Sequence, residues 1–343
     1  MGVLLITHDF GVVAEVADRV VVLRAGRVVE AGTAEEVLRR PRADYTRALI
    51  AAVPKGAPRP AAAVARPDAE PPVLAVEGLR KTFRVRQGFF RPPRAVAAVD
   101  GISLRLHRGE TLAVVGESGS GKSTLGRMIM RLAEPDAGSI RLGGEDLRAL
   151  NGEALRQARR GLQVVFQDPF ASLDPRQRVG DAVARGPMAF GTPRAQAMAE
   201  ARALLARVGL APEAANRFPH EFSGGQRQRI CIARAVALKP KVLVADEAVS
   251  ALDVSVQAQV LALLAELRRE MDLAMIFITH DLRIAAEIAD RVIVLRRGRI
   301  VEEGATRDVF AGPRDAYTRE LLDAIPGRRF FDRPDSTADR EIA

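Results

Sequence analysis

The sequence predicts an α/β fold built on a largely parallel sheet, and three observations support this. A loop of the form G-x-x-x-x-G-K-S lies between a strand-like apolar run and a helical pattern. Short apolar runs rich in branched side chains alternate with helical patterns, as in parallel sheets covered by helices. In addition, residues 3–54 recur without a gap at residues 275–326. We therefore expect one complete α/β unit that follows part of another.

The partial copy comes first in the chain. His8 matches His280 at an offset of 272 residues, and both copies end in Tyr-Thr-Arg, beginning at Tyr45 and Tyr317. Residues 1–53 are thus predicted to form the last part of such a unit: a strand, a histidine, a helix, a short hairpin and a tail. This copy carries no G-x-x-x-x-G-K-S loop, so we expect His8 to have no nucleotide of its own in this chain.

Two explanations of the partial copy remain open. The chain is a piece of a longer protein with two fused units, its start having been assigned to Met1, or evolution has kept a remnant of a unit. The first is favoured, because a chain rarely begins by exposing an apolar strand edge. An unrelated β-α-β unit would not produce a gapless match.

Two segments lack apolar periodicity. Residues 54–72 are rich in Pro and Ala and are expected to form an extended, semi-rigid linker. Residues 327–343 are expected to fray.

The complete unit is predicted to span residues 73–326. Its expected strands lie near residues 73–77, 102–106, 111–116, 163–167, 242–246 and 274–279. From about residue 168 to 238 strand signals vanish and helical patterns dominate, including 194–208 and 225–238. A parallel-sheet core with a helical insertion is the expected result.

The glycine-rich loop is a candidate phosphate site. Its glycines let backbone N–H groups point inward, and the following helix N-terminus adds partial positive charge. The lysine suits the β- and γ-phosphates, and the serine hydroxyl suits Mg²⁺. The expected nucleotide-binding residues of this loop are Gly116, Ser118, Gly119, Gly121, Lys122, Ser123 and Thr124.

A second candidate site lies at the end of the buried strand predicted at 242–246, where two acidic residues follow one another. Asp246 stands where a Walker B aspartate holds Mg²⁺. Glu247, one residue further, can face the γ-phosphate and polarise the attacking water. The pair can therefore divide the metal and water roles.

The motifs occur in a distinctive order: Gly116–Thr124, Gln167 in VVFQDP, FSGGQRQR from Phe222, VLVADE ending at Glu247, Ser250–Asp253, and His280 in FITHD. In this the chain resembles ATP-binding subunits of ABC transporters over residues 73–326. The resemblance implies a P-loop NTPase cassette: a RecA-like parallel core, an N-terminal antiparallel β part, a helical subdomain at about 168–238, and a C-terminal tail at about 305–326.

The resemblance also implies ATP and Mg²⁺ as cofactors and assigns roles. Gln167 would sense Mg²⁺ and the attacking water at the contact with a membrane partner, and His280 would contact the γ-phosphate. Asp253 would lie in a loop bridging two cassettes. The signature residues would close over the ATP of a second cassette; they are Ser223, Gly224, Gly225 and Gln226.

Phe83 falls where such cassettes place an aromatic ring that stacks on adenine. An aromatic residue after an amphipathic strand is often a core residue instead. Phe89 and Phe90 compete for the same role.

Four further stretches resemble subunits of oligopeptide and dipeptide importers, a group that includes nickel and glutathione importers: Val85–Ala95, Phe166–Arg176, Val249–Leu261 and Pro313–Leu322. Ala248 departs from the proline usual after the Walker B acids. The implied partners are a second cassette (another copy, another subunit or an N-terminal cassette), transmembrane permease subunits and, indirectly, a solute-binding protein. The implied location is the cytoplasmic face of the bacterial inner membrane, as a peripheral protein.

Composition narrows the alternatives. The net charge of +9 comes from Arg spread along the chain with no aromatic-rich basic cluster, so no nucleic-acid partner is expected. No apolar stretch approaches bilayer-spanning length. The single cysteine, Cys231, is expected in the core.

Three functional classes remain in view: an energy-coupling ATPase of a peptide-class importer, a soluble ABC ATPase acting on ribosomes or DNA, and a nucleotide-binding regulator without turnover. The second class would need a long charged linker between two full cassettes, a coiled coil or a zinc insertion, and none is visible. Intact Glu247 and His280 oppose the third.

Overall fold

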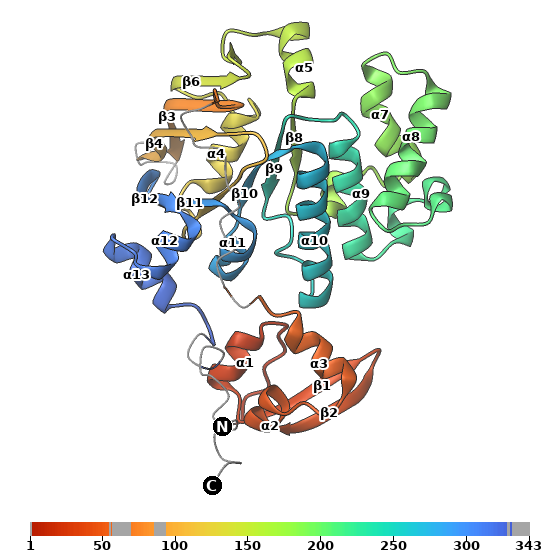
Figure 1. Ribbon diagram of the computed structural model, residues 1–343, viewed down its shortest axis with the longest axis vertical. Helices are drawn as coiled ribbons and strands as arrows, with labels where there is room; N and C mark the ends of the chain where they lie inside the picture. Colours follow the sequence, from red (N-terminus) through yellow and green to blue (C-terminus); the bar gives the residue numbers. More distant parts are fainter. Residues whose placement is uncertain (1, 55, 57–69, 86–93, 328–329, 331–343) are drawn as a thin grey trace, which may run out of the picture.

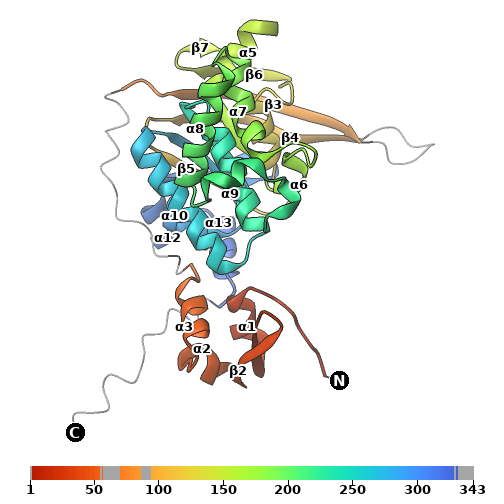
Figure 2. The same ribbon diagram turned by 90° about the vertical axis from the view of Figure 1, so that its right-hand side faces the viewer.

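The structure is a computed structural model that describes residues 2–54, 56, 70–85, 94–327 and 330. Most of the expected linker and C-terminal tail, and Phe89 and Phe90, lie outside the described residues. Figure 1 shows a large upper part and a smaller lower part formed by the first 54 residues, and Figure 2 shows the same division after a quarter turn.

The core of the large part is a six-stranded sheet with the order β12-β11-β5-β10-β9-β8. Its strands are β5 (Thr111–Val115), β8 (Leu162–Val165), β9 (Val242–Asp246), β10 (Ala274–Ile278), β11 (Arg291–Arg296) and β12 (Arg299–Ala305). All neighbours pair in parallel except β11 and β12, which form an antiparallel hairpin. Every residue of β5, β9 and β10 is buried. The predicted α/β fold with a parallel core is confirmed.

Alternate side chains of this sheet enter two cores, because successive residues of a strand point to opposite faces. Leu243 and Phe277 belong to the cluster that packs under α9 (Gly224–Val236) and α10 (Val254–Met271). Val244 and Ile276 belong to the cluster that contains α4 (Lys122–Ile129) and the second sheet. The sheet is therefore covered on both faces, with α4 and α10 on opposite sides of it (Figure 1).

The second sheet is antiparallel, with the order β4-β3-β6-β7. Its strands are β3 (Leu74–Val85), β4 (Arg94–Leu106), β6 (Ala137–Leu142) and β7 (Glu145–Asp146). Leu74 pairs with both Leu106 and Leu142, so β3 lies between β4 and β6. This is the antiparallel β part that the resemblance implied.

Between β8 and β9 the chain forms helices and turns only. They are α6 (Pro169–Ser172), α7 (Val179–Ala189), α8 (Arg194–Arg207) and α9, with 3-10 turns at Pro212–Asn216 and Pro219–Glu221. A further helix, α5 (Gly152–Arg160), comes just before β8. Cys231 on α9 is 1% exposed, as expected of a core residue, and burial raises the pKa of its thiol to about 11.

The two repeat copies form the same elements. In the first copy these are α1 (Phe10–Val16), β1 (Arg19–Arg24), β2 (Arg27–Thr33), α2 (Ala34–Arg39) and α3 (Asp44–Ala51). In the second they are α11 (Leu282–Ile288), β11, β12, α12 (Thr306–Ala311) and α13 (Ala316–Asp323). All five pairs have the same bounds after a shift of 272 residues.

The strand predicted at the start of the first copy was wrong. Residues 3–6 form no strand, and their side chains are 78%, 90%, 52% and 90% exposed. Their counterparts in the second copy, Met275–Ile278, belong to β10, which lies between β5 and β9. Within the described residues nothing pairs with the first copy in this way, so its apolar segment gains neither backbone partners nor burial.

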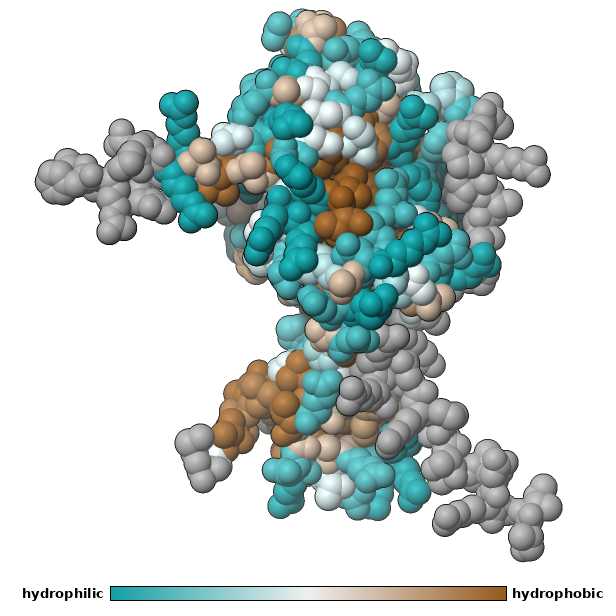
Figure 3. All heavy atoms as spheres, turned by 90° about the vertical axis from the view of Figure 1, so that its left-hand side faces the viewer, coloured by the Kyte–Doolittle hydropathy of each residue, from teal (hydrophilic) through white to brown (hydrophobic). Residues whose placement is uncertain are grey.

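The missing neighbours leave other apolar side chains of the small part exposed as well. Val21 is 58% exposed, whereas its counterpart Ile293 is fully buried against β5. Apolar side chains accordingly gather on the small part in Figure 3. Among the described residues, no helix combines the length and the apolar character needed to cross a bilayer.

One buried ion pair ties the second copy to the sheet. Asp290 Oδ2 accepts from Arg268 at 2.5 Å and from the Thr111 backbone N–H at 2.8 Å, and both paired side chains are at most 9% exposed. The counterpart of Asp290 in the first copy is Asp18, which is exposed.

We expect Asp290→Asn to lower the free energy of unfolding by about 3 kcal/mol, because it leaves the buried Arg268 without its counter-charge. Asp18→Asn, the matched control, should change it by less than about 0.5 kcal/mol. Urea denaturation followed by circular dichroism measures both. Equal effects of the two substitutions would contradict this view of the ion pair.

Candidate functional site

The parallel register brings the predicted site residues to one edge of the sheet. Val165 pairs with Ala245, Asp246 with Ile278, and Ile278 with Val114, so these strands end level with one another. The loops that follow them carry Gln167, the Asp246–Glu247 pair, His280 and the glycine-rich loop. In α/β sheets this carboxyl edge is where ligands bind.

The back of the glycine-rich loop packs against the backbone of β4 and β11. Gly121, at φ 106°, precedes α4, and a Cβ there would lie 2.2 Å from the Ala98 carbonyl oxygen. A Cβ on Gly116, at φ 142°, would lie 2.3 Å from the Leu295 carbonyl oxygen. By contrast, a Cβ on Gly119 would meet nothing within 4 Å. The loop thus has a packed back and an open front, which fits a phosphate group against its N–H groups.

Lys122 is folded back into this loop. Its ammonium donates to the carbonyl oxygens of Gly116 at 2.6 Å and Glu117 at 2.8 Å, and the residue is 5% exposed. Burial lowers the pKa of the ammonium, while the charges of Glu247, Asp246 and Glu117 act in the opposite direction. Two of its three N–H bonds are used, which leaves one for a phosphate oxygen.

Ser123 and Asp246 form the candidate metal site. The Ser123 hydroxyl donates to Asp246 Oδ1 at 3.2 Å across the gap between α4 and β9. Burial raises the pKa of the Asp246 carboxyl, and the hydrogen bond from Ser123 partly offsets this. A hydroxyl and one carboxylate, completed by phosphate oxygens and water, are a donor set that suits Mg²⁺.

Glu247 and His280 lie together at the same edge. His280 Nδ1 is 3.4 Å from Glu247 Oε1, and the imidazole is 58% exposed. Glu247 has φ 49°, and its backbone is held by its N–H bond to Ile278 O at 2.9 Å and by the Ser250 hydroxyl at 3.0 Å. A left-handed non-glycine residue held so firmly is a feature that often occurs at active sites.

Gln167 and Phe83 are both accessible. Gln167 is exposed just beyond β8. Phe83 is 42% exposed on β3, with the Lys81 ammonium 5.7 Å from its ring centre, so it is not the core residue that one alternative suggested. Adenine stacking by Phe83 stays a prediction.

The signature residues are at the start of α9 and do not join the phosphate loop. Ser223 caps the helix: its hydroxyl accepts from the Gln226 N–H at 3.4 Å, and Gln226 Oε1 accepts from the Ser223 N–H at 3.0 Å. Asp253 caps α10, because its carboxylate accepts from the Val256 N–H at 3.0 Å. In the described part of the chain, none of these residues hydrogen-bonds to the phosphate loop.

The two signature glycines differ in their surroundings. A Cβ on Gly225 would lie 2.2 Å from Val256 Cγ1, so this glycine lets α9 approach α10 closely. A Cβ on Gly224 would meet nothing within 4 Å, so there is open space in front of this glycine. Packing within the chain therefore explains why residue 225 is a glycine, but it does not explain the glycine at position 224.

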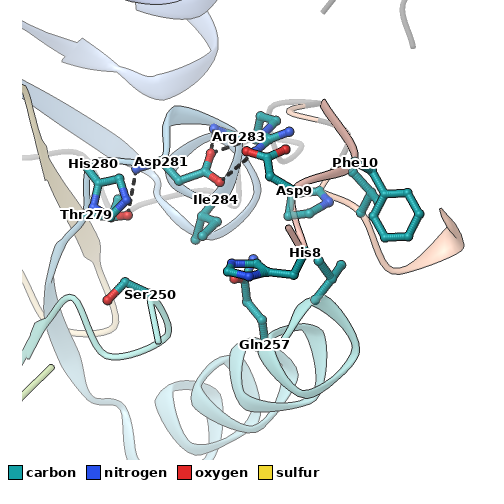
Figure 4. A pocket seen from close by; sticks show the side chains of 13 residues that line it. His8, Asp9, Phe10, Ser250, Gln257, Thr279, His280, Asp281, Arg283 and Ile284 are labelled. Carbon is teal, nitrogen blue, oxygen red and sulfur yellow. Dashed lines mark hydrogen bonds and ion pairs between the residues drawn. The ribbon is translucent and has the colours of Figure 1, made fainter. Parts of the chain in front are cut away.

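A small pocket separates His280 from its repeat counterpart. It has a volume of about 110 Å³ and lies between the small part and the start of α10. In Figure 4, His8 points toward Gln257, while Arg283 bridges Asp281 at 3.2 Å and Asp9 at 3.5 Å. His8 therefore lies next to the large part of the structure, but it does not line the phosphate loop.

The structure adds one contact that the sequence did not predict. The hydroxyl of Tyr317, on α13, accepts from the backbone N–H of Glu117 in the phosphate loop at 3.2 Å. The only signal for it was the tyrosine at the end of both repeat copies.

Comparison with known proteins gives two matching families. "ABC transporter" matches residues 99–250, and "Oligopeptide/dipeptide transporter, C-terminal region" matches residues 29–86 and 301–339. The second match thus falls on both repeat copies.

Similar curated proteins include the glutathione import ATP-binding protein GsiA of Escherichia coli K12, 50% identical over 350 residues. GsiA of Salmonella paratyphi A is 48% identical over 349 residues. Each alignment covers 95% of this chain, and the chain spans only 56% of the length of these relatives.

Similar solved structures include the ATP-binding cassette MJ0796, a dimer bound to ADP and Pi, with a TM-score of 0.61 and 27% identity over 68% of this chain and 99% of that one. CbiO1 of Clostridium perfringens, part of the transporter complex cbiONQ, has a TM-score of 0.60 and 27% identity over 76% of this chain and 98% of that one.

We expect Gly225→Ala to lower the free energy of unfolding by about 1–3 kcal/mol, because the new methyl group overpacks the contact between α9 and α10. Gly224→Ala, its neighbour, should fold with unchanged stability. Thermal unfolding of the two variants measures this. Similar losses at both positions would show that the contact with Val256 does not decide the difference.

Proposed function

The chain carries an ATP-binding domain of the ABC-transporter family and the C-terminal region of the oligopeptide/dipeptide branch, and we propose that it energises a small-solute importer by hydrolysing ATP. The proposed cargo class is peptides and peptide-like solutes, including glutathione, which the relatives named GsiA are said to import. Nickel is the alternative cargo within the same group. The proposed location is the cytoplasmic face of the bacterial inner membrane, held there by permease subunits.

The observation that carries the proposal is the joint position of four groups at one sheet edge. The Ser123 hydroxyl and Asp246 are 3.2 Å apart, and Glu247 and His280 are 3.4 Å apart on the adjoining strand ends. Phosphoryl transfer needs little from a protein beyond positioning and charge neutralisation. This sheet edge provides positioning and charge neutralisation, and it lies beside a loop whose open front can take a phosphate group.

Each group has a proposed task in hydrolysis. The phosphate loop and Lys122 bind the β- and γ-phosphates of ATP, with Phe83 against the adenine. Ser123, Asp246 and Gln167 would hold Mg²⁺, which would neutralise phosphate charge. Glu247 accepts a proton from the water that attacks the γ-phosphate, and His280 donates a hydrogen bond to that phosphate.

We propose that this site is completed by the signature of a second cassette. Ser223, Gly224, Gly225 and Gln226 lie at a helix N-terminus, where N–H groups favour an anion, yet in the described chain none of them hydrogen-bonds to the phosphate loop. The cassette MJ0796 forms a dimer with ADP and Pi bound, which supports such pairing. The proposed partner is another copy, another subunit or an N-terminal cassette, and Asp253 is proposed to lie at the contact with it.

Closure of the paired cassettes is proposed to move the permease. Gln167 follows β8 where the core passes into the helical segment, so a change at the phosphates can shift α6 to α9 relative to the sheet. A solute-binding protein would act only indirectly, through the permease.

We expect Glu247→Gln to reduce steady-state ATP hydrolysis by about 10²- to 10⁴-fold, because the variant lacks the proton acceptor. ATP binding should be retained, since Lys122 and the loop are unchanged. A phosphate-release assay and equilibrium binding of ATP measure the two effects. Glu153→Gln, an exposed acid paired with Arg156 on α5, is the control and should behave as wild type. Wild-type turnover in Glu247→Gln would remove Glu247 from the proposed role.

A further inference from the structure

The C-terminal helix α13 reaches the back of the phosphate loop and holds one particular peptide unit there. The carbonyl oxygen of Gly116 accepts from the Lys122 ammonium at 2.6 Å. The N–H of the same peptide unit, which belongs to Glu117, donates to the Tyr317 hydroxyl at 3.2 Å. Because a peptide unit is planar, fixing its N–H also fixes the direction of its carbonyl group.

Tyr317 is itself firmly placed. It is 3% exposed, and its backbone N–H donates to the capping carboxylate of Asp315 at 2.8 Å. The Arg296 guanidinium lies over its ring, 4.5 Å from the centre. Arg296 follows Leu295, whose carbonyl oxygen abuts Gly116. The end of β11 and α13 thus form one support behind the loop.

We propose that Tyr317 is a positioning residue for Lys122, through which the C-terminal region sets the affinity of the phosphate loop for nucleotide. The proposal rests on the proposed function, because Lys122 matters here as a phosphate ligand. The Tyr317 hydroxyl fixes the Gly116–Glu117 peptide, and the carbonyl group of that peptide fixes the ammonium. Without the hydroxyl, the N–H of Glu117 loses this partly buried acceptor, and the carbonyl group can turn away from Lys122.

The first repeat copy supplies a matched control. Tyr45 is the counterpart of Tyr317, and Arg24 lies over its ring 4.9 Å from the centre, as Arg296 does in the second copy. The Arg–Tyr pair therefore recurs, whereas a phosphate loop beside it does not, because this sequence has one such loop. Packing of the tail explains the pair in both copies, but it does not explain the bond to Glu117.

The test is ATP binding by the full chain carrying Tyr317→Phe, which keeps the ring and its contact with Arg296 but removes the hydroxyl. We expect ATP affinity to fall by about five- to thirtyfold, as for loss of one partly buried hydrogen bond. The hydrolysis rate at saturating ATP should change by less than about threefold, since Glu247 and His280 are untouched. Tyr45→Phe should bind ATP as the wild type does.

A second measurement separates positioning from general packing. If Tyr317 acts through Lys122, then Tyr317→Phe should weaken ATP binding little further in a Lys122→Ala chain. The thermal midpoint without nucleotide should be nearly the same for Tyr317→Phe and the wild type. Additive losses of affinity, or a loss of thermal stability with unchanged affinity, would overturn the proposal.

The outcomes also separate this inference from the proposed function. Wild-type affinity in Tyr317→Phe, in a chain that binds and hydrolyses ATP normally, would contradict the inference alone. Absence of ATP binding by the wild-type chain would contradict the proposed function and the inference with it.

Discussion

The parallel pairing of β10 between β5 and β9 is the constraint on which the rest of the structure depends. This register places the ends of three buried strands level, and the phosphate loop, Asp246–Glu247 and His280 follow those ends directly. The first repeat copy shows the effect of losing it. Residues 3–6 resemble β10 in sequence but lack both neighbours in the described chain, and they form no strand and are exposed. Its hairpin and helices still form, because β1 pairs with β2 and the helices α2 and α3 pack on this hairpin within the copy itself.

The same strand register separates the two parts of the proposed ATP site, which are the phosphate-loop edge of the sheet and the signature residues. The sheet edge brings together the groups proposed to bind phosphate, metal and water, whereas the signature residues are at the start of α9 and make no hydrogen bond to the phosphate loop in the described chain. Gly225 is required by packing within the chain, but the space in front of Gly224 is open. The open space at Gly224 is consistent with catalysis that begins only when two cassettes meet. Such a requirement would link ATP binding to a movement that a permease can use.

Local sequence patterns predicted much of this molecule. The phosphate loop, the acids after β9 and the capped start of α9 each depend on residues close in sequence, so their local shapes could be inferred. The strand at residues 3–6 was predicted wrongly, because a strand in a parallel sheet depends on distant partners. The strands β6 and β7 were not predicted; they are short and exposed in part, and β6 is paired with β3 from far away in the chain. For the same reason the contact of Tyr317 with Glu117, 200 residues apart, could not be predicted.

The central claim, that the phosphate loop of one cassette works with the signature of another, is tested most directly by mixing two inactive chains. Lys122→Ala has a defective loop and an intact signature, whereas Gly224→Asp keeps the loop and places a carboxylate where the partner's phosphates would bind. Each chain alone should hydrolyse little ATP. An equal mixture should recover up to about a quarter of wild-type activity, because half of the pairs are mixed and each mixed pair has one intact site. A mixture no more active than its components, or a Gly224→Asp chain that is fully active alone, would contradict the account.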